Sequence, residues 1–224
     1  MRKIFLIFFI LSFSSCQLEE KEVDSASELI EKSIRFHDSN GVWAEFSGTF
    51  LIVDSLPAPR ENRSYQVSFQ NTLNKVHYSI EDLEFIVWRD SVQVFKGEIE
   101  KDRALMLRNY YSYLWGLPMK LKDPGTQVDE KILRKELNGK SFMVVRVPYE
   151  KDTWYFYFDP ETAQLEAYKF YQDELAQKGE IIYLDGLVDF EELLIPKSRS
   201  WYRTENGEFL GRDELVSITA AQSN

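Results

Sequence analysis

The sequence has little of several residue types, and each shortage argues against a class of protein. Cys16 is the only cysteine in 224 residues, so no disulfide can form within the chain. Acidic residues outnumber lysine and arginine by 37 to 27, which gives a net charge of −10. This charge argues against nucleic-acid binding and against electrostatic docking on anionic lipid. Beyond residue 13, no run reaches the roughly 18 apolar residues of a transmembrane helix.

Histidine is scarce as well, which weakens both metal and nucleophile chemistry. His37 and His77 lie 40 residues apart, whereas a zinc site needs three or four N, S or O ligands. We therefore predict no metal and no cofactor, and we interpret His37 as a helix-end residue that interacts with the last helical carbonyls. The chain has no Gly-x-Ser-x-Gly elbow, phosphate-binding loop or Gly-x-Gly-x-x-Gly fingerprint. These shortages predict that the protein is not an enzyme.

Carboxylates are plentiful, so a hydrolase that uses a pair of acids stays as the less favoured alternative. The obvious doublet is Glu191-Glu192. Neighbouring residues on a strand point to opposite faces, so these two would not share a site. We interpret the doublet as a solvated strand edge.

The N-terminus has the pattern of a signal peptide. Arg2 and Lys3 precede an apolar run over residues 4–13 that is too short to span a bilayer. Small residues then lead to Cys16, a pattern that resembles a bacterial lipobox, although Phe13 stands where most lipoboxes carry leucine. We predict a signal peptide over residues 1–15. Lipid chains on Cys16 would anchor the protein to a membrane that it does not cross.

Between the cysteine and the first strand we expect a tether and a helix. Residues 16–25 are polar and acidic and form either a solvated linker or a surface-export signal like those of Bacteroidetes-type lipoproteins. Ser25 and Glu28 match a capping box, and apolar residues follow at helical spacing. This pattern predicts a helix that begins at Ala26 and ends at Phe36 or His37.

From Trp43 onward the apolar period changes from 3.6 to 2, which predicts strands. Turn signals separate them, and Asn138-Gly139 is the best two-residue hairpin signal. Pro196 lies within a strand pattern and indicates an edge strand or a bulge, because proline cannot donate to the ladder. We predict a mainly β fold of the α+β class, a curved antiparallel sheet of about ten strands in one domain over residues 26–219. A C-terminal tail over residues 220–224 would follow.

The middle of the chain, residues 109–126, is the longest segment that is not strand-like. Around it, Leu107, Tyr110, Tyr111 and Leu114 fall at helical spacing and give one apolar face. Gly116 and Pro118 end the helix, the glycine in a left-handed conformation. We expect a short aromatic helix that lies across the concave face of the sheet.

Four segments carry a resemblance to a family: 36–43, 113–126, 154–162 and 195–202. They resemble the signature of an uncharacterised family of Bacteroidetes-type lipoproteins, a resemblance that supplies no catalytic residues. The order of elements is also similar to the lipoprotein carrier LolA and its relatives, LolB included, in which a half-open barrel covered by helices holds acyl chains. This second resemblance implies binding of a lipid or other hydrophobic ligand. For the functional arginine of those carriers, the candidates here are Arg60 and Arg63.

The central aromatic residues have two interpretations, either plain core or a lid over an apolar pocket. Lys120, beyond the helix, could meet a ligand carboxylate or phosphate at the pocket mouth, or belong to a basic turn. The candidate ligand-binding residues are Phe85, Val87, Tyr110, Tyr111, Trp115, Leu117, Met119, Lys120, Trp154 and Phe156.

The favoured function is a lipid-anchored protein of the bacterial cell envelope that binds a hydrophobic ligand. The anchor would lie in the outer membrane, with the protein on the periplasmic side or on the cell surface. A surface or periplasmic interaction module with a filled core is the alternative. The expected partners are the membrane, through lipidated Cys16, and the ligand, and we expect a monomer that binds no nucleic acid.

Overall fold

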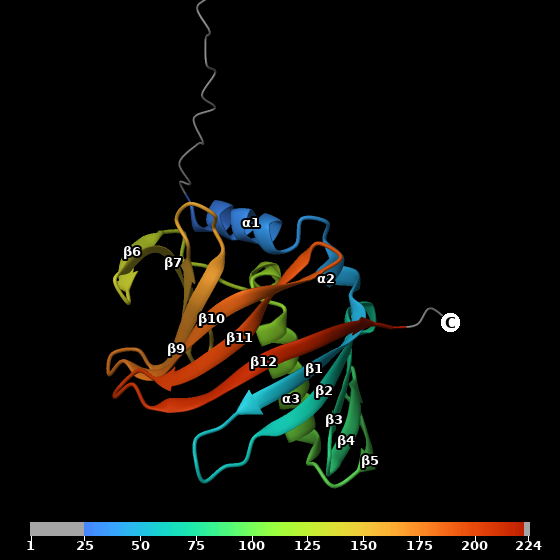
Figure 1. Ribbon diagram of the computed structural model, residues 1–224. Helices are drawn as coiled ribbons and strands as arrows, with labels where there is room; N and C mark the ends of the chain where they lie inside the picture. Colours follow the sequence, from blue (N-terminus) through green and yellow to red (C-terminus); the bar gives the residue numbers. More distant parts are fainter. Residues whose placement is uncertain (1–24, 222–224) are drawn as a thin grey trace, which may run out of the picture.

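Twelve antiparallel strands form one curved, open sheet (Figure 1). The computed structural model describes residues 25–221. The strand order is β5-β4-β3-β2-β1-β12-β11-β10-β9-β8-β7-β6, so β1 and β12 meet in the middle of the sheet. The strands are β1 Ser47–Ser55, β2 Arg63–Gln70, β3 Lys75–Ile80, β4 Leu83–Trp88, β5 Ser91–Lys96, β6 Leu133–Leu137, β7 Lys140–Pro148, β8 Thr153–Phe158, β9 Leu165–Asp173, β10 Lys178–Phe190, β11 Leu193–Arg203 and β12 Phe209–Ala220.

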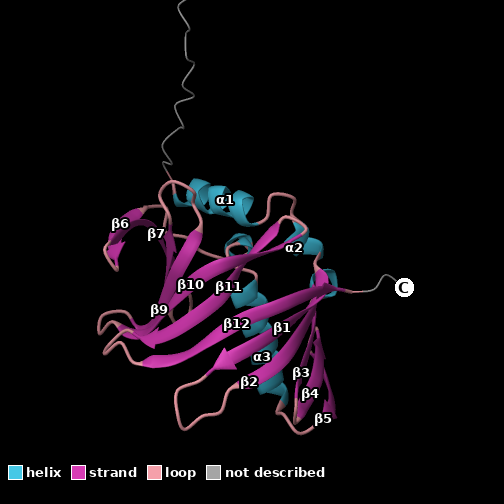
Figure 2. Cartoon of the chain, viewed as in Figure 1, coloured by secondary structure: helices cyan, strands magenta, loops and turns pink. Residues whose placement is uncertain are grey.

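The helices lie on the concave side and at one end of the sheet (Figure 2). They are α1 Ala26–His37, α2 Val42–Glu45 and α3 Lys101–Trp115, with short 3₁₀ turns η1 Asn71–Leu73 and η2 Met119–Lys122. The long helix α3 lies against the concave face, and α1 crosses the end of the sheet near the C-terminus of α3. This architecture confirms the predicted fold class, with twelve strands in place of about ten.

Two apolar clusters pack between α3 and the concave face of the sheet. The first joins Leu114 to Leu29 of α1 and to inward residues of β7 to β11. The second joins Trp115 to Phe50 of β1 and to inward residues of β2 to β4. Burial of these side chains supplies the main driving force for folding, at about 25 cal/mol per Å² of apolar surface.

Several local predictions are confirmed. Ser25 Oγ accepts a hydrogen bond from Glu28 N at 3.2 Å and caps α1, as the capping box requires. Asn138 and Gly139 both have positive φ, 53° and 78°, as a two-residue hairpin turn demands. No helix within residues 25–221 has the length and apolarity to cross a membrane. The predicted signal peptide 1–15, Cys16 and nearly all of the tether 16–25 lie outside the described residues.

The end of α3 differs from the prediction in one respect. The helix stops at Gly116, but this glycine has φ −91°, so the predicted left-handed conformation is wrong. The reason for a glycine here is space, because a Cβ would lie 2.6 Å from Nε1 of Trp43 and 2.7 Å from Ser112 O. Glycine lets the indole of Trp43 pack against the end of α3.

His37 and the acidic doublet are also corrected. His37 is buried, and its Nδ1 lies 2.8 Å from the carbonyl oxygen of Leu194 in β11, rather than near the last carbonyls of its own helix. Leu165 N donates to His37 Nε2 at 3.1 Å, so Nε2 carries no proton and the ring is neutral. The Glu191-Glu192 pair forms the two-residue turn between β10 and β11, with φ of 53° and 67°, rather than a strand edge.

Pro196 lies in β11, which has neighbours on both sides, so the prediction of an edge strand is wrong for the strand as a whole. The ladder between β11 and β12 begins only at Ser198. Pro196 therefore lies in the half of β11 that pairs with β10 alone. Proline has no backbone N–H, but no strand within residues 25–221 lies on the β12 side of this half to accept a hydrogen bond from it.

Candidate functional site

A hollow remains along one face of α3. It has a volume of about 940 Å³ and borders the helix from Arg103 to Tyr111, and we call it the concave hollow. Met106 and Tyr110 of α3 line it and remain 41% and 40% exposed, although both belong to types that are usually buried. Apolar side chains from the sheet and its loops complete the walls: Leu56, Leu83, Ile99, Phe170, Trp201 and Leu210.

Aromatic stacking fixes the α3 side of this hollow. Tyr111 stacks on Tyr78 of β3, with ring centroids 5.5 Å apart and planes 23° apart. Tyr110 lies over Trp201 of β11 at 6.1 Å and 22°. Burial raises the pKa of Tyr111 above the usual value for tyrosine, so its hydroxyl stays neutral at physiological pH.

A row of four charged residues crosses the sheet at directly opposite positions. Arg63 of β2 pairs with Asp54 of β1, Asp54 pairs with Asp213 of β12, and Asp213 pairs with Arg199 of β11. We call Arg63, Asp54, Asp213 and Arg199 the charged row; its two acids lie side by side with one arginine on each flank. Arg63, Asp54 and Asp213 line the concave hollow, as do Arg60, Arg103, Gln172, Glu180 and Arg203, so its lining mixes charged and apolar side chains.

Asp54 is held firmly within the charged row. Its carboxylate is buried and accepts hydrogen bonds from the backbone N and the Nε of Arg63, at 2.7 and 2.9 Å. The Arg63 side chain itself is half exposed at the hollow. Nε and Nη2 of Arg63 both donate to Oδ2 of Asp54, which fixes the guanidinium plane, so Arg63 presents a defined edge to anything in the hollow.

Asp213 is the less satisfied acid of the row. Burial raises the pKa of its carboxyl to about 6, while the Arg199 charge and the hydrogen bond from Trp201 Nε1, at 3.2 Å, oppose this rise. Its carboxyl thus titrates close to neutral pH at the floor of the hollow. A group in that position can accept a hydrogen bond from a ligand or, when protonated, donate one.

Arg199 ties the row to α3. Its guanidinium lies 3.5 Å from the ring centroid of Trp115 and donates to the carbonyl oxygens of Leu114 and Pro196, at 3.3 and 3.1 Å. Within the described part of the chain, Arg199 Nε and the hydroxyl of Tyr168 have no hydrogen-bond partner although both are buried. The cation therefore stabilises the helix C-terminus, where the backbone carries partial negative charge.

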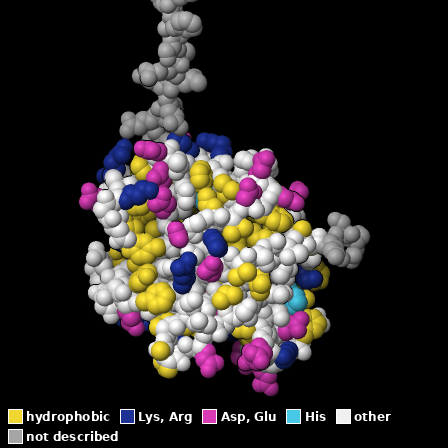
Figure 3. Space-filling view, in the orientation of Figure 1, with side chains coloured by type: hydrophobic (Ala, Val, Ile, Leu, Met, Phe, Trp, Pro, Cys, Tyr) yellow, Lys and Arg dark blue, Asp and Glu magenta, His cyan; other side chains and the backbone are white. Residues whose placement is uncertain are grey.

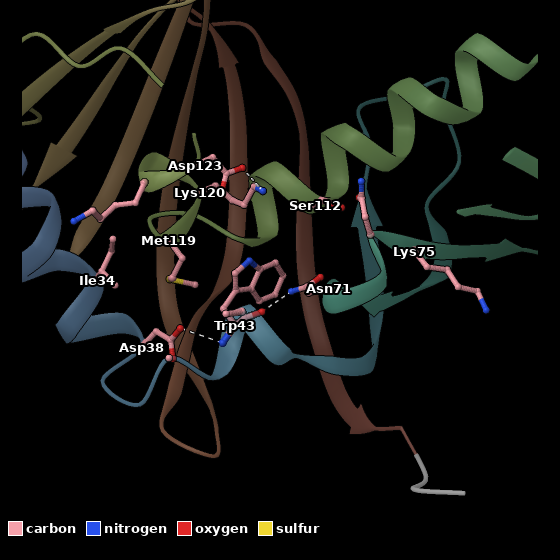
Figure 4. A pocket seen from close by; sticks show the side chains of 13 residues that line it. Ile34, Asp38, Trp43, Asn71, Lys75, Ser112, Met119, Lys120 and Asp123 are labelled. Carbon is pink, nitrogen blue, oxygen red and sulfur yellow. Dashed lines mark hydrogen bonds and ion pairs between the residues drawn. The ribbon is translucent and has the colours of Figure 1, made fainter. Parts of the chain in front are cut away.

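A second hollow, of about 510 Å³, lies between α1, α2 and η2 (Figure 4). The Asp38 carboxylate accepts hydrogen bonds from Val42 N and Trp43 N, at 2.6 and 3.0 Å, and so positions the indole that forms one wall. Lys120 forms an ion pair with Asp123 at the rim. Its ammonium is therefore already neutralised by the chain itself.

The structure divides the predicted site residues between the two hollows and the core around them. Tyr110 and Tyr111 line the concave hollow, whereas Met119 and Lys120 line the second hollow. Trp154 is half buried and packs edge-on against Tyr113 of α3. The remaining candidates are buried in the two core clusters: Phe85, Val87, Trp115, Leu117 and Phe156. Both arginines considered from the carrier resemblance, Arg60 and Arg63, line the concave hollow.

Sequence reasoning missed Asp54, Asp213 and Arg199. A signal for each was present, since each charge occupies an inward position of an alternating strand. Asp54 follows the inward residues Phe50 and Ile52 at the strand period of two, and Arg199 precedes the inward Trp201. A charge at an inward position is costly and therefore marks a structural or functional site.

The site contains no group of three metal-binding side chains among residues 25–221. Two solved structures share the fold. A LolA superfamily protein from Nitrosomonas europaea matches 89% of this chain and 95% of its own, at 8% identity and a TM-score of 0.56. A DUF1329 family protein from Desulfovibrio piger matches 90% of this chain and 95% of its own, at 7% identity and a TM-score of 0.50. At these identities the likeness shows the fold alone, and it confirms the LolA-like prediction.

No match was found among curated proteins. A family model described as a family of unknown function, DUF6503, matches residues 2–217. Neither this description nor those of the two structures names an enzymatic activity. Because the match runs over nearly the whole sequence, the chain belongs to the DUF6503 family.

Proposed function

We propose that the protein binds an amphiphilic, lipid-type ligand in the concave hollow while a lipid on Cys16 holds it at the bacterial cell envelope. One observation carries the ligand proposal. The apolar core clusters leave a hollow of about 940 Å³ along the face of α3 that carries Arg103, Met106 and Tyr110. This volume lies within the range of known small-molecule sites.

The composition of the hollow supports a ligand with one apolar and one polar end. Met106, Leu107 and Phe170 offer apolar contact, and burial of an acyl chain there is favourable by about 0.8 kcal/mol per CH₂ group. Arg63 and Asp213 offer charge and hydrogen bonding at the floor. A headgroup that carries both an acceptor and a donor would satisfy the two side chains together.

The fold supports the same proposal. The carrier resemblance implies an apolar hollow between a curved sheet and its helices, and the structural neighbour from Nitrosomonas europaea belongs to the LolA superfamily. The lipobox resemblance at Cys16 supports a lipid anchor in the outer membrane, on its periplasmic side or at the surface. A stationary binder fits this anchor better than a soluble shuttle does.

Native mass spectrometry with lipid extraction tests the ligand proposal on residues 17–224, a chain that includes every described residue. We expect a co-purifying species of lipid mass. Met106→Trp should remove it, because the larger side chain would project from α3 into the hollow. Leu175→Trp is the matched control, since Leu175 is 99% exposed at the β9–β10 turn and lies outside the hollow.

A protein that shows only its sequence mass, in both detergent-free and lipid-supplemented preparations, would contradict the ligand proposal. That result would favour the alternative of an interaction module with no ligand. Equal lipid retention by Met106→Trp and Leu175→Trp would place the lipid elsewhere than in the concave hollow.

A further inference from the structure

The outer face of the sheet carries a separate aromatic cluster. Successive strand residues point to opposite faces, and Tyr155 and Tyr157 of β8 pack with Phe142 and Tyr171, apart from the inward core. Figure 3 shows hydrophobic side chains gathered over β9 and β10 at the left of this face. Tyr157 and Tyr171 are only 2% and 8% exposed, so this cluster is a packed surface rather than a scatter of exposed rings.

Beside this cluster lies a hollow of about 620 Å³, which we call the outer hollow. Three hairpin turns border it and contribute Asn138, Gln177 and Thr204. Its floor is formed by the strands, with Lys169 and Tyr171 of β9 among the lining residues. The outer hollow shares no lining residue with the concave hollow except Arg203.

Lys169 is the unusual residue of the outer hollow. Its ammonium lies 5.4 and 5.8 Å from the ring centroids of Tyr157 and Tyr171, and it forms no ion pair or hydrogen bond with any residue from 25 to 221. The side chain is half buried, and burial lowers the pKa of its amine. A half-buried ammonium without a carboxylate partner is rare, because desolvation of a charge has to be offset.

The surroundings of Lys169 do not offer a free carboxylate. Glu174 lies beside Tyr155, but Arg146 holds it with two hydrogen bonds, at 2.8 and 2.7 Å, and the Tyr155 hydroxyl donates to it as well. Glu205 accepts hydrogen bonds from the hydroxyl of Thr204 and from Gly179 N, at 3.1 and 3.4 Å. A second ammonium, that of Lys135, lies 4.3 Å from the Tyr155 ring and repels Lys169. In a chain of net charge −10, this corner is a local positive site that an anion would complete.

We propose that the outer hollow binds a carboxylated sugar, with Lys169 as the partner of the carboxylate. The lining alternates tyrosine rings (Tyr171, Tyr183, Tyr202) with amides and hydroxyls. A pyranose has the complementary surface, an apolar C–H face that stacks on a ring and an edge of hydroxyls that bond amides. Arg203 also lines the hollow, but it forms an ion pair with Glu208 at 3.2 Å, which leaves the Lys169 ammonium as the unpaired cation among the described lining residues. A single ammonium suits a carboxylate, whereas phosphate recognition favours arginine forks and backbone N–H groups.

The experiment is an NMR and calorimetric titration of residues 17–224 with trigalacturonate at physiological salt. We expect saturable binding with shifts at the side-chain amides of Asn138 and Gln177. Lys169→Met, which keeps the apolar stem, should weaken binding by about tenfold or more. Lys151→Met is the matched control, since it removes the same charge from an exposed position outside the hollow and should leave binding unchanged.

Three results would overturn the proposal: no saturation by trigalacturonate, equal affinity for the neutral trisaccharide maltotriose, or equal affinity for inorganic phosphate. If Lys151→Met loses as much affinity as Lys169→Met, net charge alone would explain the loss, and the proposal would also be overturned. If Lys169→Met does not fold, the ring protons of Tyr171 and Tyr202 in the wild-type chain show whether trigalacturonate occupies the outer hollow. Unchanged ring-proton shifts would overturn the proposal. The outcome is independent of the lipid proposal, because the two hollows lie on opposite faces of the sheet.

Discussion

At the scale of single residues, the charged row is the least expected feature of the interior. Arg63, Asp54, Asp213 and Arg199 stand side by side on four neighbouring strands, and three of them are buried or nearly so. Buried charges are tolerated when each has a partner, and removal of one partner costs more than the pair contributes. The two central acids depend on the two flanking arginines in this way.

Arg199→Met tests this dependence. Without the cation, Asp213 keeps its burial and its neighbour Asp54, so the pKa of its carboxyl should rise above 6. The free energy of unfolding should fall by about 3 kcal/mol or more at pH 7, because a buried carboxylate loses its counter-charge. Carboxyl ¹³C NMR and urea unfolding measure the two effects. Arg212→Met is the control, since Arg212 is half exposed, and an unchanged Asp213 titration would contradict the dependence.

His37 predicts a pH dependence of stability. Burial lowers the pKa of its imidazole from 6.5 to about 4, so the unfolded state binds more protons between these values. The free energy of unfolding should therefore fall as the pH drops from 6.5 towards 4, by about 3 kcal/mol from this residue alone.

Urea unfolding at pH 7.0 and 4.5 measures this fall. His37→Gln should show a smaller loss between the two pH values than the wild type, whatever its stability at pH 7. His77→Gln should lose as much as the wild type, since His77 is partly exposed and bonds Glu84 instead. An identical pH dependence in all three chains would show that His37 is not the group responsible.

At the scale of elements, turns and helix ends explain which predictions succeeded. Asn138-Gly139 was predicted because asparagine and glycine tolerate positive φ. Glu191-Glu192 makes the same kind of turn with residues that do not, so its chemistry gives no signal. The start of α3 gives none either, since Glu100 at its N-cap makes no side-chain hydrogen bond. Only the C-terminal half of that helix was therefore predicted.

Glu191→Gly should stabilise the β10–β11 turn. Glutamate at φ 53° costs about 1 kcal/mol relative to glycine, and Glu191 makes no described hydrogen bond that would be lost. Thermal or urea unfolding should show a gain of about 1 kcal/mol. Glu192→Gly is the comparison, because Glu192 accepts a hydrogen bond from Asn40 Nδ2 at 2.6 Å and should gain less. A loss of stability in Glu191→Gly would argue that the side chain has a partner in solution.

At the scale of the whole molecule, the sequence predicted the sheet and the inward helix but not where space would remain. Inward aromatic residues such as Trp115, Phe85 and Phe156 give the same sequence pattern whether they line a cavity or fill a core, and here they are buried. The hollow depends on how far α3 lies from β1 and β12, a distance set by contacts remote in sequence. Periodicity reports which face a residue takes and carries no information on that spacing.

The anchor is a whole-molecule prediction as well. Cys16→Ser should move the protein from the membrane fraction to the soluble fraction and abolish labelling by a clickable fatty acid, because the thiol is the atom that lipid would modify. Fractionation and in-gel fluorescence measure the two effects. Labelling that survives the substitution would exclude Cys16 as the lipidated residue. Unchanged membrane association without labelling would point to retention by another route.

The open sheet has a consequence for the size of a ligand under the proposed function. Strands β5 and β6 stand at the two edges, and within the described chain each pairs with one neighbour only. In a closed sheet, strand number and stagger fix the diameter, and hence the girth of any guest. Here no ladder joins the edges, so the clearance above the floor is governed by the side-chain contacts of α3. Under the proposed function, ligand preference should follow the volume of side chains at positions such as Met106, so that single substitutions there change the length of acyl chain that the hollow accepts.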